Sequence, residues 1–358
     1  MRIAVLHDII PADAPPDQHD GLAQAQAVGA ALLLLGHEPL PLGFPADAAA
    51  ARTALAACAP DMVFNLVEAP GGKGSNIHLA PQLLEDMGLP FTGAGAAAMR
   101  LSTNKLAAKQ AMRAAGVPTP DWMDLAKNRN NEPANNSHTA IPQRVIVKSV
   151  WEHASIGMDA ASVLYPTEWD DILAALRARQ ARWGGEWFAE AFVAGREFAV
   201  TLLDGPEGAA APQVLPPAEM LFLDFDPRTP RIIDYAAKWD PDSPAYGKTP
   251  RTFDLAPHDA ALVDRLRDTA LACWRVCGLS GYARVDFRVD AAGTPLAIDI
   301  NANPCIAPDA GFAAALHRAG IGYEEAIARI VAAPLRRTID SAATGATGAT
   351  PTPSGARA

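Results

Sequence analysis

The chain has 358 residues, a formal net charge of −10 at pH 7, 49% hydrophobic residues and 20% charged residues. This length allows two or three domains around a large core. The negative charge argues against a general nucleic-acid-binding or anionic-membrane-binding surface. The four scattered cysteines predict free thiols in a reducing compartment rather than a disulfide framework.

The first residues form a short apolar run that reaches acidic residues at once, so no secretion signal is expected. The longest apolar run, near residues 30–35, is too short to span a bilayer. We therefore expect a cytoplasmic protein without a membrane partner.

The N-terminal part alternates β-prone and helix-prone segments. Strands are expected at residues 2–7, 37–42 and 62–66, and helices at 22–35, 46–57 and 77–87. A proline- and aspartate-rich loop separates the first strand and helix at 11–20, and a glycine-rich turn lies at 71–74. This alternation predicts a small, mostly parallel sheet with helices on both faces, closed by residues 91–93.

Further strands and helices are expected along the rest of the chain. The strands lie at 144–149, 186–192 and 197–203, and the helices at 103–115, 169–179, 262–277, 309–319 and 323–332. Residues 127–138 predict an asparagine-rich loop, and residues 221–252 show little hydrophobic periodicity and predict a second, longer loop. Loops as long as the second are often lids over a site. The low-complexity tail from about residue 340 predicts disorder.

Two apolar, β-prone runs at 282–288 and 297–304 carry polar residues at alternate positions. Arg284 and Asp286 share one face of the first, and Asp299, Asn301 and Asn303 share one face of the second. Hard oxygen ligands beside a guanidinium are what a Mg²⁺–nucleotide phosphate site requires. The alternation by itself fits a pair of half-exposed strands with polar outer faces equally well.

Several short motifs precede these strands in a fixed order between residues 60 and 332. They are Phe64-Asn65-Leu66, Gly88-Leu89-Pro90-Phe91-Thr92-Gly93, Asn104-Lys105, Val145-Ile146-Val147-Lys148, Ala189-Glu190, Gly195-Arg196-Glu197-Phe198, Leu215-Pro216-Pro217-Ala218-Glu219 and Asp234-Tyr235-Ala236-Ala237-Lys238. In this order they resemble the ATP-grasp superfamily, and most closely its D-alanine–D-alanine ligase branch. One such motif would mean little, but the whole ordered set argues against coincidence.

The resemblance implies an α/β protein with the ATP-grasp fold behind an N-terminal Rossmann-like, pre-ATP-grasp domain. The implied boundaries are 1–93 for that domain, 94–195 for a central, smaller lobe, 196–335 for a C-terminal lobe with the metal site and lid, and 336–358 for a disordered tail. It also implies a homodimer formed through the N-terminal domain.

The resemblance implies that three lysines bind the nucleotide phosphates. Lys105 and Lys148 reach them from the two sides of the cleft, and Lys238 in the lid adds a donor on closure. Each of the three could instead be an ordinary surface lysine. This alternative fits Lys148 least well, because Lys148 ends an apolar strand.

Four residues are implied at the nucleoside end of the same site. Glu190 would accept a hydrogen bond from the adenine amino group, and the backbone of Phe192 and Val193 would complete the adenine clamp. Glu197 would bind the ribose. Without the resemblance, both glutamates are simply polar residues flanking a strand turn.

The strand pair then becomes the metal and reaction centre. Asp286, Asp299 and Asn301 would hold Mg²⁺ (or Mn²⁺) between the phosphates, and Arg284 would stabilise charge on the transferring phosphoryl group. Family members often carry glutamate where this chain has Asp299, and the shorter side chain puts its bridging of two ions in doubt.

The chain departs from the family where the amino acids bind. D-Alanine–D-alanine ligases frame the first amino acid with a glutamate near the first strand, a serine in the phosphate-covering loop and a tyrosine in the lid. Here the first has no recognisable counterpart, and Ala154 and Trp239 stand at the other two positions. Candidate substrate contacts are Glu68, His153, Ser155, Trp239 and Cys305.

We therefore expect an ATP- and Mg²⁺-dependent carboxylate–amine ligase that acts on amino acids or small peptides through an acyl phosphate, but not on two D-alanines. One alternative is D-alanine–D-alanine ligase itself with an altered pocket. Another is a catalytically degenerate ATP-binding protein. A carboxylase-type enzyme is disfavoured because no biotin-attachment region is seen.

Overall fold

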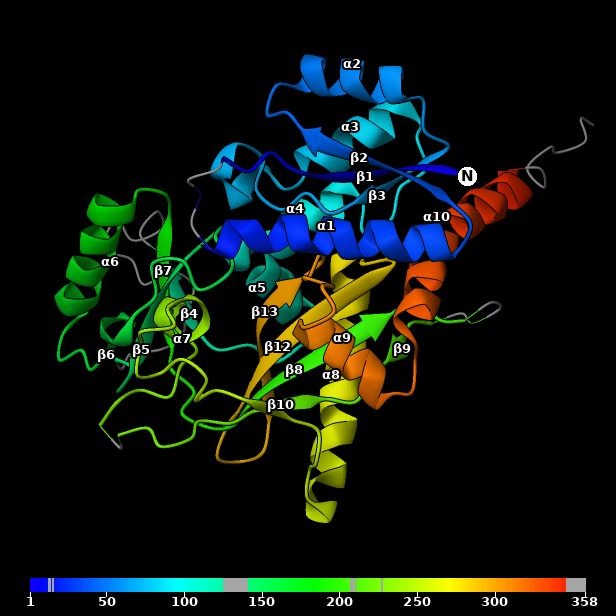
Figure 1. Ribbon diagram of the computed structural model, residues 1–358. Helices are drawn as coiled ribbons and strands as arrows, with labels where there is room; N and C mark the ends of the chain where they lie inside the picture. Colours follow the sequence, from blue (N-terminus) through cyan, green and yellow to red (C-terminus); the bar gives the residue numbers. More distant parts are fainter. Residues whose placement is uncertain are drawn as a thin grey trace, which may run out of the picture.

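The computed structural model describes residues 1–11, 14, 16–124, 141–206, 209, 211–226 and 228–345. The asparagine-rich loop expected at 127–138 lies outside these residues. Within them, strands form three separate sheets of three, six and four strands. Figure 1 shows the small N-terminal sheet at the top, the four-stranded sheet at the left and the six-stranded sheet in the centre. Helices accompany all three, as expected for an α/β protein.

The N-terminal sheet is parallel, as predicted. Its strands are β1 (Arg2–Asp8), β2 (Glu38–Phe44) and β3 (Met62–Asn65), in the order β2-β1-β3. The central strand β1 is buried along its apolar run, because helices cover both faces of the sheet. Helices α2 (Ala48–Cys58) and α3 (Leu79–Met87) share one buried cluster with the sheet. The glycine-rich turn forms two short 3₁₀ segments, at Pro70–Gly72 and Gly74–Asn76.

Helix α1 (Pro16–Leu34) begins inside the loop expected at 11–20, so that expectation was wrong. Proline is tolerated in the first turn of a helix, where its missing N–H has no intrahelical partner. The apolar face of α1, with Val28 and Leu32, packs in one cluster with Phe312 of helix α9 and Ile330 of helix α10. Helix α1 therefore connects the N-terminal sheet to the C-terminal part of the chain (Figure 1).

The four-stranded sheet is antiparallel and has a core of its own. Its strands, in the order β4-β7-β5-β6, are β4 (Trp122–Asp124), β7 (Trp187–Ala191), β5 (Val145–Ser149) and β6 (Val163–Leu164). Helix α6 (Trp169–Trp183) packs Ile172 and Leu176 against Val147 on one face. By alternation, Lys148 and Glu190 lie on the opposite face. Strands β4 and β6 are too short to leave a periodic signal.

The six-stranded sheet is antiparallel, with the order β11-β10-β8-β12-β13 and β9 paired to β8. Its strands are β8 (Glu197–Leu203), β9 (Gln213–Val214), β10 (Ala218–Met220), β11 (Arg251–Thr252), β12 (Tyr282–Val289) and β13 (Pro295–Asn301). Helix α8 (Ala260–Cys277) packs against this sheet in the largest buried cluster, which also takes in α4 (Ala96–Thr103) and α5 (Lys105–Ala114).

The helix expected at 103–115 is α5, and the unpredicted helix α4 precedes it, with Asn104 between them. The side chain of Asn104 accepts a hydrogen bond from Ala107 N at 2.9 Å, so it caps α5 and ends α4. Within the lid region, Tyr235–Trp239 form the short helix α7.

The C-terminal helices are α9 (Gly311–Arg318) and α10 (Tyr323–Gly345). Helix α10 continues past residue 336, where the disordered tail is expected, and residues 346–358 lie outside the described part. In the described part of the chain, no helix has the length and apolar character needed to cross a bilayer.

Candidate active site

A cavity of about 610 Å³ lies between the six-stranded sheet and the face of the four-stranded sheet that is opposite α6. Every predicted site residue except Glu68 lines it: Lys105, Lys148, His153, Ser155, Glu190, Phe192, Val193, Glu197, Lys238, Trp239, Arg284, Asp286, Asp299, Asn301 and Cys305. Residues from separate motifs thus surround one space large enough for a nucleotide and a small substrate.

Strands β12 and β13 bring the predicted reaction centre to one face. Their antiparallel register places Arg284 opposite Asn301 and Asp286 opposite Asp299. Arg284 binds Asp286 in a bidentate pair, with Nε 2.8 Å from Oδ1 and Nη2 2.9 Å from Oδ2. The predicted convergence of these four side chains is therefore present in the structure, and one guanidinium–carboxylate contact links two of them.

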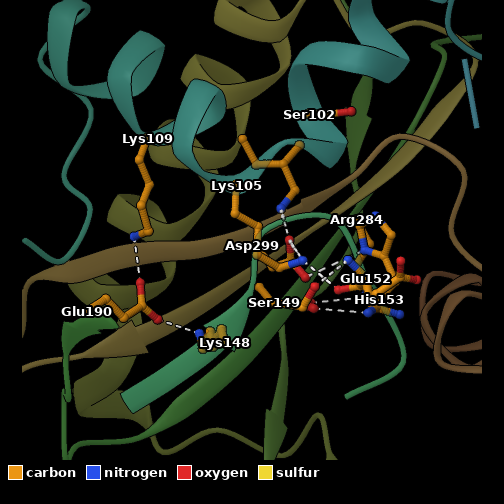
Figure 2. Close-up of polar contacts among 12 residues, drawn as sticks. Ser102, Lys105, Lys109, Lys148, Ser149, Glu152, His153, Glu190, Arg284 and Asp299 are labelled. Atoms are coloured by element: carbon orange, nitrogen blue, oxygen red, sulfur yellow. Dashed lines mark hydrogen bonds and ion pairs between the residues drawn. The ribbon is translucent and has the colours of Figure 1, made fainter. Parts of the chain in front are cut away.

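Asp299 lies near a lysine and a histidine from two other segments. Its Oδ1 is 4.0 Å from Lys105 Nζ, and its Oδ2 is 3.8 Å from His153 Nδ1 (Figure 2). Burial by itself raises the pKa of Asp299, but the charge of Lys105, followed by the contact with His153, outweighs burial and holds this pKa far below its usual value. Asp299 is therefore ionised at any physiological pH.

The donor set fits Mg²⁺ held jointly with a nucleotide. Asp286, Asp299 and Asn301 offer two carboxylates and one amide oxygen on a shared face. In the described part of the chain, no three His, Cys, Asp or Glu side chains are grouped so that they could hold a metal ion without help. Mg²⁺ is usually bound by one or two carboxylates and completes its shell with phosphates and water. Asp286, Asp299 and Asn301 suit such a site, in which phosphates and water would supply the remaining ligands.

Asn303 does not join this face, contrary to expectation. Its side chain donates to Val67 O at 3.1 Å and accepts from the Tyr282 hydroxyl at 2.5 Å. Because Asn303 lies beyond the end of β13, strand alternation no longer sets its direction. It is a buried structural residue that ties the six-stranded sheet to the N-terminal part.

Three lysines lie around Glu190 and the covering loop, which comprises residues 152–157. One of these lysines was not predicted from the sequence. Lys105 Nζ donates to Glu152 O at 2.7 Å, and Lys148 pairs with Glu190 Oε1. The missed residue is Lys109, whose Nζ lies 2.6 Å from Glu190 Oε2 (Figure 2). Lys109 follows Lys105 by one helical turn, so the i, i+4 spacing was a signal that both face the same way.

At the nucleoside end, Phe192 and Val193 line the cavity next to Glu190 as expected. Glu197, expected at the ribose, has an oxygen 2.7 Å from Arg288 Nη2. The Arg288 guanidinium also lies 5.6 Å from the centre of the Phe192 ring. Arg288 is the second site residue that was not predicted from the sequence, and its contacts orient both Glu197 and Phe192.

The covering loop and the lid meet across the cavity. Ser155 Oγ donates to Ile233 O at 2.8 Å, and Trp239 Nε1 donates to Ala154 O at 3.3 Å. Ala154 and Ser155 have φ values of 56° and 61°, a left-handed conformation that non-glycine residues rarely adopt. Lys238 lines the cavity from α7.

Glu68 lies just outside the cavity lining in an acidic pocket. Gln24 Nε2 is 3.4 Å from its Oε1, and Asp8 accepts a hydrogen bond from the backbone N–H of Glu68 at 2.8 Å. Nearby, Cys305 Sγ donates to Asp20 Oδ2 at 3.1 Å. Burial, followed by the charge of Asp8, raises the pKa of Glu68 to about 8, and burial raises the pKa of the Cys305 thiol. Cys305 is thus a poor nucleophile.

We expect Glu68→Gln to remove a pH-dependent loss of stability. Between the ordinary pKa of 4.5 and about 8, folded Glu68 keeps a proton that the unfolded chain has released. The unfolded state then binds fewer protons, so stability falls as pH rises through this window. Urea unfolding of both proteins at pH 5, 7 and 9 checks this: the variant should gain stability relative to wild type as pH rises. A constant difference would contradict it.

A family model described as "D-ala D-ala ligase C-terminus" matches residues 111–332. The chain is 28% identical to the D-alanine–D-alanine ligase of Gluconobacter oxydans (strain 621H), over 91% of this chain and 96% of the relative. It is 31% identical to that of Laribacter hongkongensis (strain HLHK9), over 76% and 79%. The "uncharacterized protein y4sG" of Sinorhizobium fredii (strain NBRC 101917 / NGR234) is 29% identical, over 77% and 75%.

Solved structures of similar shape include the D-alanine–D-alanine ligase of Bacillus anthracis complexed with ATP. It has a TM-score of 0.70 and 19% identity, with 95% of this chain and 99% of that chain covered. The enzyme from Coxiella burnetii has a TM-score of 0.67 and 16% identity, over 97% and 98%. At these identities the likeness shows the fold, and it confirms the predicted ATP-grasp architecture.

Proposed function

The chain belongs to the D-alanine–D-alanine ligase family, and we propose on that basis that it joins an amino-acid or small-peptide carboxylate to an amine through an acyl phosphate. The protein is an ATP- and Mg²⁺-dependent, ADP-forming carbon–nitrogen ligase. The observation that carries the proposal is the shared face of β12 and β13, which brings Arg284 and the three candidate metal ligands into one cavity with Lys105 and Lys148.

In the proposed reaction, the substrate carboxylate attacks the γ-phosphate, and ADP leaves. The amine then attacks the acyl carbonyl, and phosphate leaves as the amide bond forms. Lys105 and Lys148 hold the phosphates, and Arg284 stabilises the charge that develops on the transferring group. Mg²⁺ on Asp286, Asp299 and Asn301 supplies further neutralisation of the phosphates when bound.

We propose that the acid substrate differs from D-alanine. In place of a serine–tyrosine pair, the covering loop and the lid meet through a contact from the Trp239 indole to the Ala154 backbone. Glu68 stands where family members usually have a histidine after the third strand, and burial raises its pKa to about 8. When a buried polar network is replaced throughout, its partners change, because an unmatched ligand would leave polar groups unpaired.

D-Alanine–D-alanine synthesis is the second candidate. It is favoured by the relatives that carry this name and that cover nearly the whole chain. A protein without an assigned activity is equally similar, so overall identity does not separate the two candidates.

A phosphate-release screen with Mg²⁺–ATP and D- and L-amino acids, singly and in pairs, tests the proposal. We expect at least one pair to react about tenfold faster than D-alanine alone, because pocket contacts discriminate by roughly that factor or more. Mass spectrometry identifies the product. If D-alanyl-D-alanine forms fastest, the substrate proposal is wrong and the second candidate holds. If no pair releases phosphate although ATP binds, the ligase assignment itself is contradicted.

A further inference from the structure

Lys109 is a buried lysine to which the reaction described above gives no role. Its side chain is 1% exposed, so solvent does not reach the ammonium group. Nζ lies 2.6 Å from Glu190 Oε2, donates to Thr119 Oγ1 at 2.8 Å and is 3.4 Å from Pro120 O. Two hydrogen bonds and one ion pair thus hold the ammonium group. Lys109 is therefore fixed in place and is not available to the phosphates.

Glu190 is held from two different sides. Lys148 pairs with Oε1, and Lys109 pairs with Oε2 (Figure 2). Of these three described residues, Glu190 and Lys148 line the cavity and Lys109 does not. One oxygen of the carboxylate therefore faces the nucleotide site, while the other is anchored from behind by helix α5.

The two lysines differ in what ligand binding does to them. Lys148 faces the cavity, and the proposed function gives it to the phosphates, so it would leave Glu190 Oε1 open to the base. Lys109 cannot follow, because Thr119 and Pro120 hold it. Burial raises the pKa of Glu190, but the charges of Lys109 and then Lys148 outweigh this and lower it. With Lys148 displaced, the ion pair with Lys109 still favours the ionised form of Glu190.

We propose that Lys109 makes the nucleotide site select a 6-amino purine over a 6-oxo purine by fixing both the charge and the orientation of Glu190, on the premise of the proposed function that Glu190 meets the base. An ionised carboxylate only accepts hydrogen bonds. It therefore pairs with an amino group and repels a 6-oxo oxygen. Lys109 is a positioning residue, since it acts on the base only through Glu190.

Dissociation constants for Mg²⁺–ATP and Mg²⁺–ITP, measured by calorimetry on the full chain, test the inference without an amine or acid substrate. Wild-type protein should bind ATP about tenfold to a hundredfold tighter than ITP, the range for one hydrogen bond to a charged group. Lys109→Arg should keep this preference, because it keeps the charge. Lys73→Met is the matched control. Lys73 is exposed and outside the cavity lining, so the ratio of the ITP and ATP dissociation constants should be the same as in wild type.

The decisive variant is Glu190→Gln with Lys109 retained. Lys109 can only donate, so it should take the amide oxygen and turn the NH₂ group toward the base. The preference should then reverse, with ITP bound at least as tightly as ATP. In Lys109→Met/Glu190→Gln the amide is no longer oriented, and the ratio should approach one. This double variant leaves no unpaired carboxylate in the core, so it avoids the folding defect expected of Lys109→Met alone.

Equal ITP-to-ATP ratios in Glu190→Gln and in the double variant would overturn the inference, because Lys109 would then have no effect on orientation. Retained ATP preference in Glu190→Gln would overturn it as well. If wild-type protein binds neither nucleotide, the proposed function fails first and this inference fails with it.

Discussion

Replacing Asp286 with asparagine is expected to lower ATP-dependent phosphate release about a hundredfold to a thousandfold. The side chain is a candidate metal ligand and also the bidentate partner of Arg284. Asparagine keeps the shape but loses the negative charge, and its NH₂ group cannot accept from the guanidinium. The variant therefore weakens the metal site and releases the arginine at the same time.

The matched control for Asp286→Asn is Asp268→Asn, the same change at an exposed position on α8 outside the cavity lining. Initial rates with the fastest substrate pair, together with urea unfolding of both variants, separate a chemical defect from a folding defect. Near-wild-type turnover by Asp286→Asn would contradict the role assigned to Asp286 on β12.

We expect Gly195→Ala to be the most destabilising single-methyl addition in the described glycine turns. A Cβ at this position would lie 1.6 Å from Val289 O and 2.8 Å from its carbonyl carbon, both of them backbone atoms. Val289 N in turn donates to Arg196 O at 2.8 Å, so the two segments cannot separate without losing this backbone hydrogen bond. Overpacking against backbone should cost about 3 kcal/mol or more.

Urea unfolding midpoints of wild type, Gly195→Ala and Gly322→Ala check this expectation. A Cβ added at Gly322 would have open space around it, with nothing within 4 Å. Gly322 is also exposed and lies outside the left-handed region, so the same methyl group should change stability little. A shift of equal size in both variants would show that the close approach to Val289 carries no cost.

The sequence predicted most strands of the three sheets because apolar runs with alternating polar positions are a local property. It failed where neighbours in space decide the outcome. Helix α1 begins at Pro16, within a segment whose prolines and aspartates predict a loop, and its later turns pack in one cluster with α9 and α10, far along the chain. The break between α4 and α5 depends on a single capping side chain, Asn104. Two-residue strands such as β6 exist only because a partner strand is present.

For the site, strand alternation predicted that Arg284 and Asp286 share one face of their strand and that Asp299 and Asn301 share one face of theirs. The pairing of β12 with β13 brings the two faces together. The nucleotide residues came from the family resemblance, and their individual roles stay predictions. Contacts between distant segments, such as Lys109 with Glu190 or Arg288 with Glu197, leave no local pattern and were missed. The domain boundaries at 93, 195 and 335, the homodimer and the cytoplasmic location also stay predictions.

The ion pair between Lys109 and Glu190 also joins two bodies that are packed separately. Lys109 stands on α5, within the cluster that includes α8 and the six-stranded sheet, whereas Glu190 belongs to the four-stranded sheet, which packs on α6. Pulling a buried pair apart leaves both charges uncompensated. We therefore expect the nucleoside end of the cavity to stay closed, whereas the covering loop and the lid, which neutral hydrogen bonds of Ser155 and Trp239 join, should separate first.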